Sequence, residues 1–297
     1  MSTRIIQVDS FTDRPFAGNP AAVCLLDAPA PEPWMQHVAA EMNLSETAFV
    51  HPIEPGPLFR LRWFTPRVEV DLCGHATLAA AHVLWEERVL RPQAAAQFET
   101  RSGRLGARRQ GDWIELDFPA EALDTPIIDH LELDRIVAAL NAPLISAGRN
   151  RFDLLIELAD EKTVRELRPD YRLIASFPDR GVIATSQASS PGFDFVSRFF
   201  APRVGVDEDP VCGSAHCCLG PFWASKLGRT ELTGHQVSPR GGVVKVRVDG
   251  PRVALIGQAV TVLRGELLGR PPRMHGDSIS SSEQDGFSGS NQTTTED

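Results

Sequence analysis

The stretch Trp63-Phe-Thr-Pro-Arg-Val-Glu-Val-Asp-Leu-Cys-Gly-His-Ala-Thr recurs in altered form as Phe199-Phe-Ala-Pro-Arg-Val-Gly-Val-Asp-Glu-Asp-Pro-Val-Cys-Gly-Ser-Ala-His. Both copies contain Pro-Arg-Val, then Val-Asp, then Cys-Gly, and the second has three extra residues before its Cys-Gly. The copies lie about 137 residues apart, which is too long a period for a solenoid. The repeat therefore predicts a duplicated domain with a pseudo-twofold axis between the halves.

Each copy of the repeat runs into a stretch of small and apolar residues with helical length, 74–85 in the first half and 214–226 in the second. The first stretch has almost no polar face, so we expect a helix that is buried all round by a surrounding sheet. Short apolar segments typical of strands fill the rest, at 4–11, 21–26, 47–51, 58–64, 152–158, 181–185, 193–200, 235–238, 243–248 and 253–262, with a helix at 33–42.

This pattern predicts a mixed α/β (α+β) fold of two pseudo-symmetric domains. Pro and Asp punctuate residues 118–127, so we place the domain boundary there, giving domains at 1–121 and 122–270. Residues 275–297 are rich in Ser, Thr, Gly, Asn and Gln, and we expect them to form a disordered tail because they offer little apolar surface to bury.

Composition narrows the function classes. The 297 residues carry a formal net charge of −9, and five of the negative charges lie in the predicted tail, at Asp277, Glu283, Asp285, Glu296 and Asp297. The sequence has no basic stripe and no run of about 18 apolar residues, so we expect neither a nucleic-acid partner nor a membrane span. Five irregularly spaced cysteines and an opening segment without an apolar core favour a reduced, cytoplasmic protein.

The Cys-Gly pairs, Cys73-Gly74 and Cys212-Gly213, stand at the predicted starts of the two buried helices. Unpaired backbone N–H groups and the positive end of the helix dipole gather at such a start, where they bind carboxylates and stabilise developing oxyanions. Gly allows the backbone to approach a ligand closely. Two facing helix starts therefore predict a site for a small anionic substrate between the halves.

Four strings, in this order, resemble the PhzF-like family of phenazine biosynthesis, whose relatives include diaminopimelate epimerase and proline racemase. They are Gly18-Asn-Pro, Asn43-Leu-Ser-Glu-Thr-Ala-Phe, Cys73-Gly-His-Ala-Thr and Glu208-Asp-Pro-Val-Cys-Gly-Ser-Ala-His. The resemblance implies two similar domains, each a β-barrel-like sheet wrapped around a central helix. It also implies a homodimer, no metal or other cofactor, and an isomerase that removes and returns a proton.

The resemblance also implies roles for individual residues. Glu46 matches the general acid/base, His75 the residue that orients the substrate and assists proton transfer, and Asp209 a catalytic partner from the second domain. The remaining matches imply substrate-binding residues, which are Asn19, Gly74, Gly213 and Ser214.

One departure keeps a second mechanism open. PhzF-like proteins usually have Thr where this chain has Cys212, and paired Cys73 and Cys212 resemble racemases in which one thiol takes a proton and the other returns it. A third hypothesis is a catalytically silent protein that binds small molecules. We expect Cys24, Cys217 and Cys218 to be core residues, because free Cys is often a small buried hydrophobe. The spacing of Cys212, His216 and Cys217 suits no common zinc pattern.

Overall fold

The computed structural model describes residues 3–269 and 271. The first half of the chain contains β1 (Thr3–Ser10), β2 (Asn19–Leu25), α1 (Glu32–Met42), β3 (Glu46–Pro52), β4 (Leu58–Phe64), β5 (Glu69–Val70), α2 (Gly74–Glu86), β6 (Ala96–Thr100), β7 (Gly103–Gln110) and β8 (Trp113–Pro119). The second half contains β9 (Thr125–Pro126), α3 (His130–Leu140), β10 (Leu144–Arg149), β11 (Asp153–Leu158), α4 (Glu161–Glu166), α5 (Tyr171–Ala175), β12 (Gly181–Gln187), β13 (Phe195–Ala201), a 3-10 turn (Pro202–Val204), β14 (Val206–Asp209), α6 (Gly213–Leu227), β15 (Glu231–Gln236), β16 (Gly242–Asp249), β17 (Arg252–Gly257) and β18 (Ala259–Leu267).

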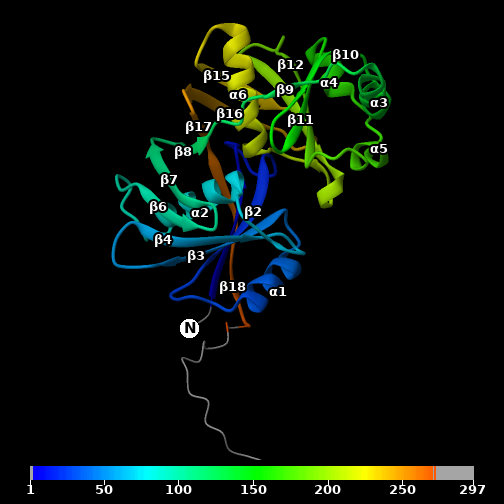
Figure 1. Cartoon of the computed structure of the whole chain (residues 1–297). Coiled ribbons are helices and arrows are strands. Elements are labelled where there is room, and N and C mark those ends of the chain that lie inside the picture. Colours follow the sequence, from blue (N-terminus) through cyan, green and yellow to red (C-terminus); the bar gives the residue numbers. More distant parts are fainter. Residues whose placement is uncertain (1–2, 270, 272–297) are drawn as a thin grey trace, which may run out of the picture.

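The two halves share one strand topology. In the first half the strands pair in the order β1–β2–β3–β4–β6–β7–β8. The pairs β2–β3 and β4–β6 are parallel, and the other four pairs are antiparallel. In the second half the strands pair in the order β10–β11–β12–β13–β15–β16–β17, with the same succession of parallel and antiparallel pairs. The predicted duplication into two pseudo-symmetric lobes is confirmed, and the lobes stand one above the other in Figure 1.

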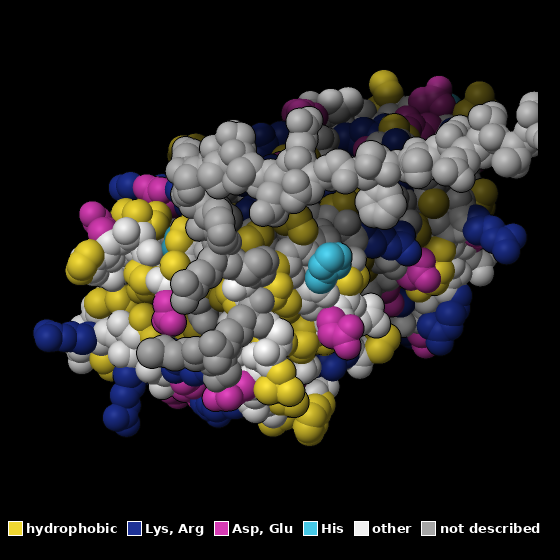
Figure 2. Space-filling view, turned by 90° about the horizontal axis from the view of Figure 1, so that it is seen from below, with side chains coloured by type: hydrophobic (Ala, Val, Ile, Leu, Met, Phe, Trp, Pro, Cys, Tyr) yellow, Lys and Arg dark blue, Asp and Glu magenta, His cyan; other side chains and the backbone are white. Residues whose placement is uncertain are grey.

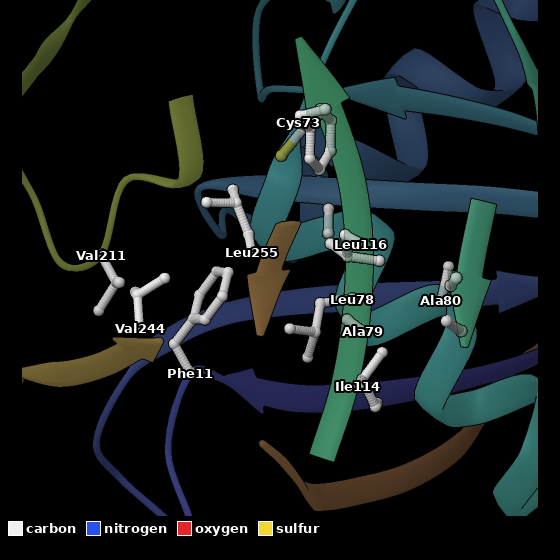
Figure 3. Packing of buried hydrophobic residues seen from close by; sticks show 14 of the residues in the cluster. Phe11, Cys73, Leu78, Ala79, Ala80, Ile114, Leu116, Val211, Val244 and Leu255 are labelled. Carbon is white, nitrogen blue, oxygen red and sulfur yellow. The ribbon is translucent and has the colours of Figure 1, made fainter. Parts of the chain in front are cut away.

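Each lobe encloses one apolar helix, as the sequence predicts. In α2, ten of the thirteen residues are buried, and α6 buries eight of fifteen. Small residues such as Ala79 and Ala80 let the sheet approach the helix closely, and Figure 3 shows Ala79 beside β8, between Leu116 and Ile114. Phe11 lies between Leu78 of α2 and Val244 of β16, so the cores of the two lobes are in contact (Figure 3).

The chain returns to the first lobe at its end. The sequence predicts one strand over 253–262, but the structure divides this segment at Gln258, whose carbonyl accepts a hydrogen bond from the Phe11 N–H at 2.7 Å. Strand β17 ends there, and β18 pairs antiparallel with β1 through the lower lobe of Figure 1. Residues 259–267 therefore lie in the sheet of the first lobe, although the boundaries 1–121 and 122–270 assign them to the second domain. Those boundaries otherwise stay a prediction, and the predicted tail at 275–297 lies outside the described residues.

Strands also join the lobes. Strand β8 pairs antiparallel with β17 from Pro119–Arg252 to Ile114–Gly257, which links all eighteen described strands into one hydrogen-bonded sheet. A second junction forms where Arg240 pairs with buried Asp9 at 2.8 Å and donates to the carbonyl of Gly18. This junction fixes the segment that leads into Asn19.

The described surface mixes both signs of charge. Figure 2 shows one face, on which Lys and Arg alternate with Asp and Glu among scattered apolar side chains, without a continuous basic stripe on its described part. No helix in the described part of the chain is long and apolar enough to span a membrane.

Candidate active site

The starts of α2 and α6 meet at the junction of the lobes. A Cβ atom placed on Gly74 would lie 3.3 Å from Cα of Gly213, and one placed on Gly213 would lie 3.2 Å from Cα of Gly74. Cys73 and Cys212 occupy the N-cap positions, and neither side chain caps its helix. The two sets of first-turn N–H groups therefore converge on one region, as the sequence predicts.

Glu46 and His75 form a close pair beside these helix starts. Glu46 begins β3, His75 is the second residue of α2, and Oε2 of Glu46 lies 3.0 Å from Nε2 of His75. The Glu46 side chain is 18% exposed, whereas that of His75 is 5% exposed. The contact is at ion-pair distance but is not aligned as a hydrogen bond, so within the described part of the chain both atoms lack a hydrogen-bond partner. Both atoms therefore have hydrogen-bonding capacity that no described residue uses.

The protonation of His75 follows from its neighbours. Burial alone lowers the pKa of a histidine, but the Cys73 sulfur and the Glu46 carboxylate together raise the pKa of His75 well above its usual value. An imidazolium at this position would favour negative charge on Glu46 or on a ligand.

Asn19 connects this pair to the second lobe. Its Nδ2 atom donates to Oδ1 of Asp209 at 2.7 Å and to the carbonyl of Val211 at 3.0 Å, and lies 3.1 Å from Nδ1 of His75. Burial raises the pKa of Asp209 to about 6, and the Glu46 carboxylate adds to the shift while His75 opposes it. The site therefore holds a second carboxyl group that changes its charge just below neutral pH.

Gln236 holds the loop that carries Asp209. Its side-chain Oε1 accepts from the backbone N–H of Cys212 at 2.9 Å, and its Nε2 donates to the carbonyl of Asp209 at 2.7 Å. Gln236 is fully buried. It was not among the predicted site residues, because a single Gln within the predicted strand 235–238 carries no sequence signal.

Ser214 lies in a polar cluster of the second lobe that sequence reasoning missed. Its Oγ accepts from Nη2 of Arg180 at 2.8 Å and lies 3.3 Å from Sγ of Cys212. Arg180 also donates through Nε and Nη2 to the two carboxylate oxygens of Asp153, at 2.9 and 2.5 Å. Alignment of the predicted strands of the two halves could have pointed to Arg180, because it directly precedes the predicted strand 181–185 as Glu46 directly precedes the predicted strand 47–51.

The two thiols occupy equivalent positions, each near the residue two places further along the chain. Sγ of Cys73 lies 3.6 Å from Nδ1 of His75, and Sγ of Cys212 lies 3.3 Å from Oγ of Ser214. Burial is the largest influence on both cysteines and raises the pKa of each. Both geometries permit contact with a ligand at the helix starts.

The first-lobe cluster has donor atoms of the kinds that bind metal. One ligand atom each from Glu46, Cys73 and His75 lie within 4.8 Å of one another, which a cation could bridge. Cys212, His216 and Cys217, whose spacing suits no common zinc pattern, are not arranged as a metal site around His216. Nδ1 of His216 donates to the carbonyl of Cys212 at 2.8 Å, and burial lowers the pKa of His216 to about 4.

Comparison with known proteins identifies relatives that match most of the chain. An uncharacterised isomerase of Halalkalibacterium halodurans is 52% identical over 268 residues, covering 90% of this chain and 99% of the relative. The crystal structure of a PhzF-family phenazine biosynthesis protein from Enterococcus faecalis superposes with a TM-score of 0.84 at 41% identity, covering 90% of this chain and 99% of the other. A predicted epimerase of Pseudomonas aeruginosa, 23% identical with a TM-score of 0.70, shares the fold over 91% of this chain and 100% of its own.

The duplicated fold and the close relatives named as isomerases define the chain as an enzyme of the isomerase class. The family described as phenazine biosynthesis-like protein, PhzC-PhzF, matches residues 8–265. The chain belongs to this family.

Proposed function

We propose that this isomerase shifts a proton on a small carboxylate-bearing metabolite, with Glu46 as the base that takes the proton and the acid that returns it. The observation that carries the proposal is the 3.0 Å contact between Glu46 and His75, whose facing atoms are buried and lack hydrogen-bond partners among the described residues. A polar pair left unpaired at a junction of two lobes is a reason to expect a ligand there.

The chemistry balances without an external oxidant or reductant. An oxygen of Glu46 takes a proton from carbon, and the electrons of the broken C–H bond move into a neighbouring conjugated system. The facing N–H groups of α2 and α6 stabilise the negative charge that develops on the substrate oxygen. Glu46 then returns the proton to another carbon, so that the product is an isomer of the substrate.

The neighbours of Glu46 support this cycle. A positively charged His75 stabilises the ionised carboxylate that begins the cycle. Asp209, with its pKa raised to about 6, supplies either a hydrogen-bond donor or an acceptor within a narrow pH range. Asn19 holds Asp209 in position relative to His75.

Solvent exchange tests the assignment. In D2O, the wild type should incorporate deuterium into a substrate found by screening small conjugated carboxylic acids. Glu46→Gln should slow exchange by at least about 10²-fold, the scale of general acid–base catalysis, while leaving the unfolding temperature unchanged. Glu54→Gln, in the exposed turn at the other end of β3, is the matched control and should behave as wild type. Wild-type exchange by Glu46→Gln contradicts the proposal.

A two-thiol racemase is the second candidate, and the equivalent placement of Cys73 and Cys212 at the facing helix starts is the observation in its favour. Full exchange in a Cys73→Ala, Cys212→Ala double variant rules it out. Complete loss, with Glu46→Gln still active, establishes it. The absence of exchange in any tested acid favours the silent binding protein. A homodimer and independence of cofactors remain predictions from the family resemblance, and a cytoplasmic location remains a prediction from the cysteines and the opening segment.

A further inference from the structure

The second lobe has a contact close to the position equivalent to the Glu46–His75 contact, with different chemistry. Phe64 lies opposite Thr47 in the first lobe, and its counterpart in the repeat, Phe200, lies opposite Val182 in the second. The start of β12 is thus equivalent to the start of β3. Glu46, the first residue of β3, and Arg180, one residue before β12, each contact the second residue of the enclosed helix. The first lobe places an acid against an imidazole there, and the second places a guanidinium against a hydroxyl.

Arg180 is held in place on several sides. Asp153, which is 1% exposed, binds its guanidinium through both carboxylate oxygens, a geometry that fixes the plane of the group. The rings of Phe152 and Phe199 lie 5.2 and 5.7 Å from its central carbon. Even so, the Arg180 side chain remains 36% exposed, and its Nη1 atom has no hydrogen-bond partner among the described residues. An arginine fixed in this way and still open on one edge can bind an oxyanion.

The contact with Arg180 determines which way the Ser214 hydroxyl points. A serine hydroxyl has one hydrogen to donate and two lone pairs that accept. Because Arg180 donates to Oγ of Ser214, the hydroxyl hydrogen must point elsewhere, and Sγ of Cys212 is the other close partner. Sulfur is a weak acceptor, so an oxygen atom of a ligand would replace it readily. Ser214 is therefore prepared to donate to a substrate oxygen.

The charges on the two sides of the site differ. Glu46 and Asp209 supply acidic groups near His75, whereas Arg180 supplies positive charge beside Ser214. Burial raises the pKa of Asp209 and of Cys212, and Arg180 acts in the opposite direction on both, so its charge reaches the site. An anionic group of a ligand is repelled at the acidic side and attracted at the Arg180 side.

We propose that Arg180, fixed by Asp153, is the positioning residue that makes Ser214 a hydrogen-bond donor and selects substrates with a carboxylate on the second-lobe side of the site. This inference rests on the proposed function for the location of the pocket, but it concerns ligand binding and not proton transfer. It also orients the reaction, because a carboxylate held at Ser214 places the remaining carbon atoms of a small substrate towards Glu46.

Binding of two inert probes, benzoate and benzamide, tests the proposal because they differ in charge and hardly in shape. Wild type should bind benzoate more tightly in calorimetry or ligand-observed NMR. Arg180→Gln should weaken benzoate binding by about tenfold or more and leave benzamide binding nearly unchanged. Arg180→Lys, which keeps the charge but loses the planar fork, should fall between the two.

Matched controls separate the outcomes. Arg149→Gln removes a guanidinium that binds Asp179 with the same two-pronged geometry in the same lobe, and it should leave the benzoate preference unchanged. If Arg180→Gln does not fold, Arg180→Lys and Ser214→Ala must still reduce the preference. An unaltered preference in the folded Arg180 variants, or no benzoate binding by wild type, overturns the proposal. Glu46→Gln should keep the preference, so a failure of the proposed base is distinguishable from a failure of this inference.

Discussion

The amide nitrogen of Asn19 in the first lobe donates a 2.7 Å hydrogen bond to the carboxylate of Asp209 in the second. Asn19 and its partner are brought together from β2 and β14, which are 190 residues apart in the chain. The contact ties the Glu46–His75 pair to the helix start at Cys212. It also places a titratable carboxyl group in a partly buried position, which has a measurable consequence for stability.

The stability of the protein should depend on pH through Asp209. Its pKa is about 6 in the folded state, above its ordinary value of 3.8, so the folded state holds this proton more tightly than the unfolded state. The stabilising contribution is complete below pH ~4 and is lost as pH rises through ~6. The free energy of unfolding of the wild type, minus that of Asp209→Asn, should decrease by about 1 to 3 kcal/mol over this range.

Urea unfolding at four pH values between ~4 and ~7 measures this difference. Asp209→Glu keeps a carboxyl group at the site and is the matched control, for which the difference should show a weaker pH dependence. A difference that stays constant, or one that increases with pH, contradicts the assignment.

The contact between Gly74 and Gly213 leads to a second prediction. Since a Cβ on either residue would lie 3.2 to 3.3 Å from the Cα of the other, Gly74→Ala and Gly213→Ala should each push the helix starts apart. We expect a destabilisation of about 1 to 3 kcal/mol from overpacking and a loss of exchange activity. The losses in the double variant should not add, because both substitutions force the same displacement.

Gly106→Ala provides the control, since a Cβ there meets no atom within 4 Å. Thermal unfolding and deuterium exchange, measured on the two single variants, the double variant and this control, test the prediction. Wild-type activity in Gly74→Ala and Gly213→Ala would show that the helix starts need not approach so closely.

The sequence predicts the scaffold well where one residue pattern determines one element. The run of small and apolar residues after Cys73 predicts a helix over 74–85, and α2 spans Gly74–Glu86. The second copy predicts 214–226, and α6 spans Gly213–Leu227. Both helix predictions are correct because a segment that is apolar on every side must be buried, and a lobe made of β-sheet can bury it only at its centre.

Pairing partners are harder to predict. The alternation of apolar and polar residues near residue 260 predicts a strand, but it does not predict that this strand pairs with β1, more than 240 residues away. Arg180 and Asp153 were missed for the same reason, since only the parallel pairing of β11 with β12 brings them together. A lone Arg before a strand is ordinarily a solvated side chain. The assigned site residues were found because they lie within recognisable strings.

Metal dependence provides the last prediction. Glu46, Cys73 and His75 could bridge a cation, yet the proposed cycle uses Glu46 as a free base. If that cycle is correct, chelators should not reduce deuterium exchange, and Zn²⁺ should inhibit it by occupying the base. Cys73→Ser should weaken the inhibition by about tenfold or more, because removal of a thiolate ligand lowers zinc affinity. Cys217→Ser changes a buried thiol outside this cluster and should retain full sensitivity. Exchange that is lost with a chelator and restored by Zn²⁺ would instead make the metal a participant, and Glu46 one of its ligands.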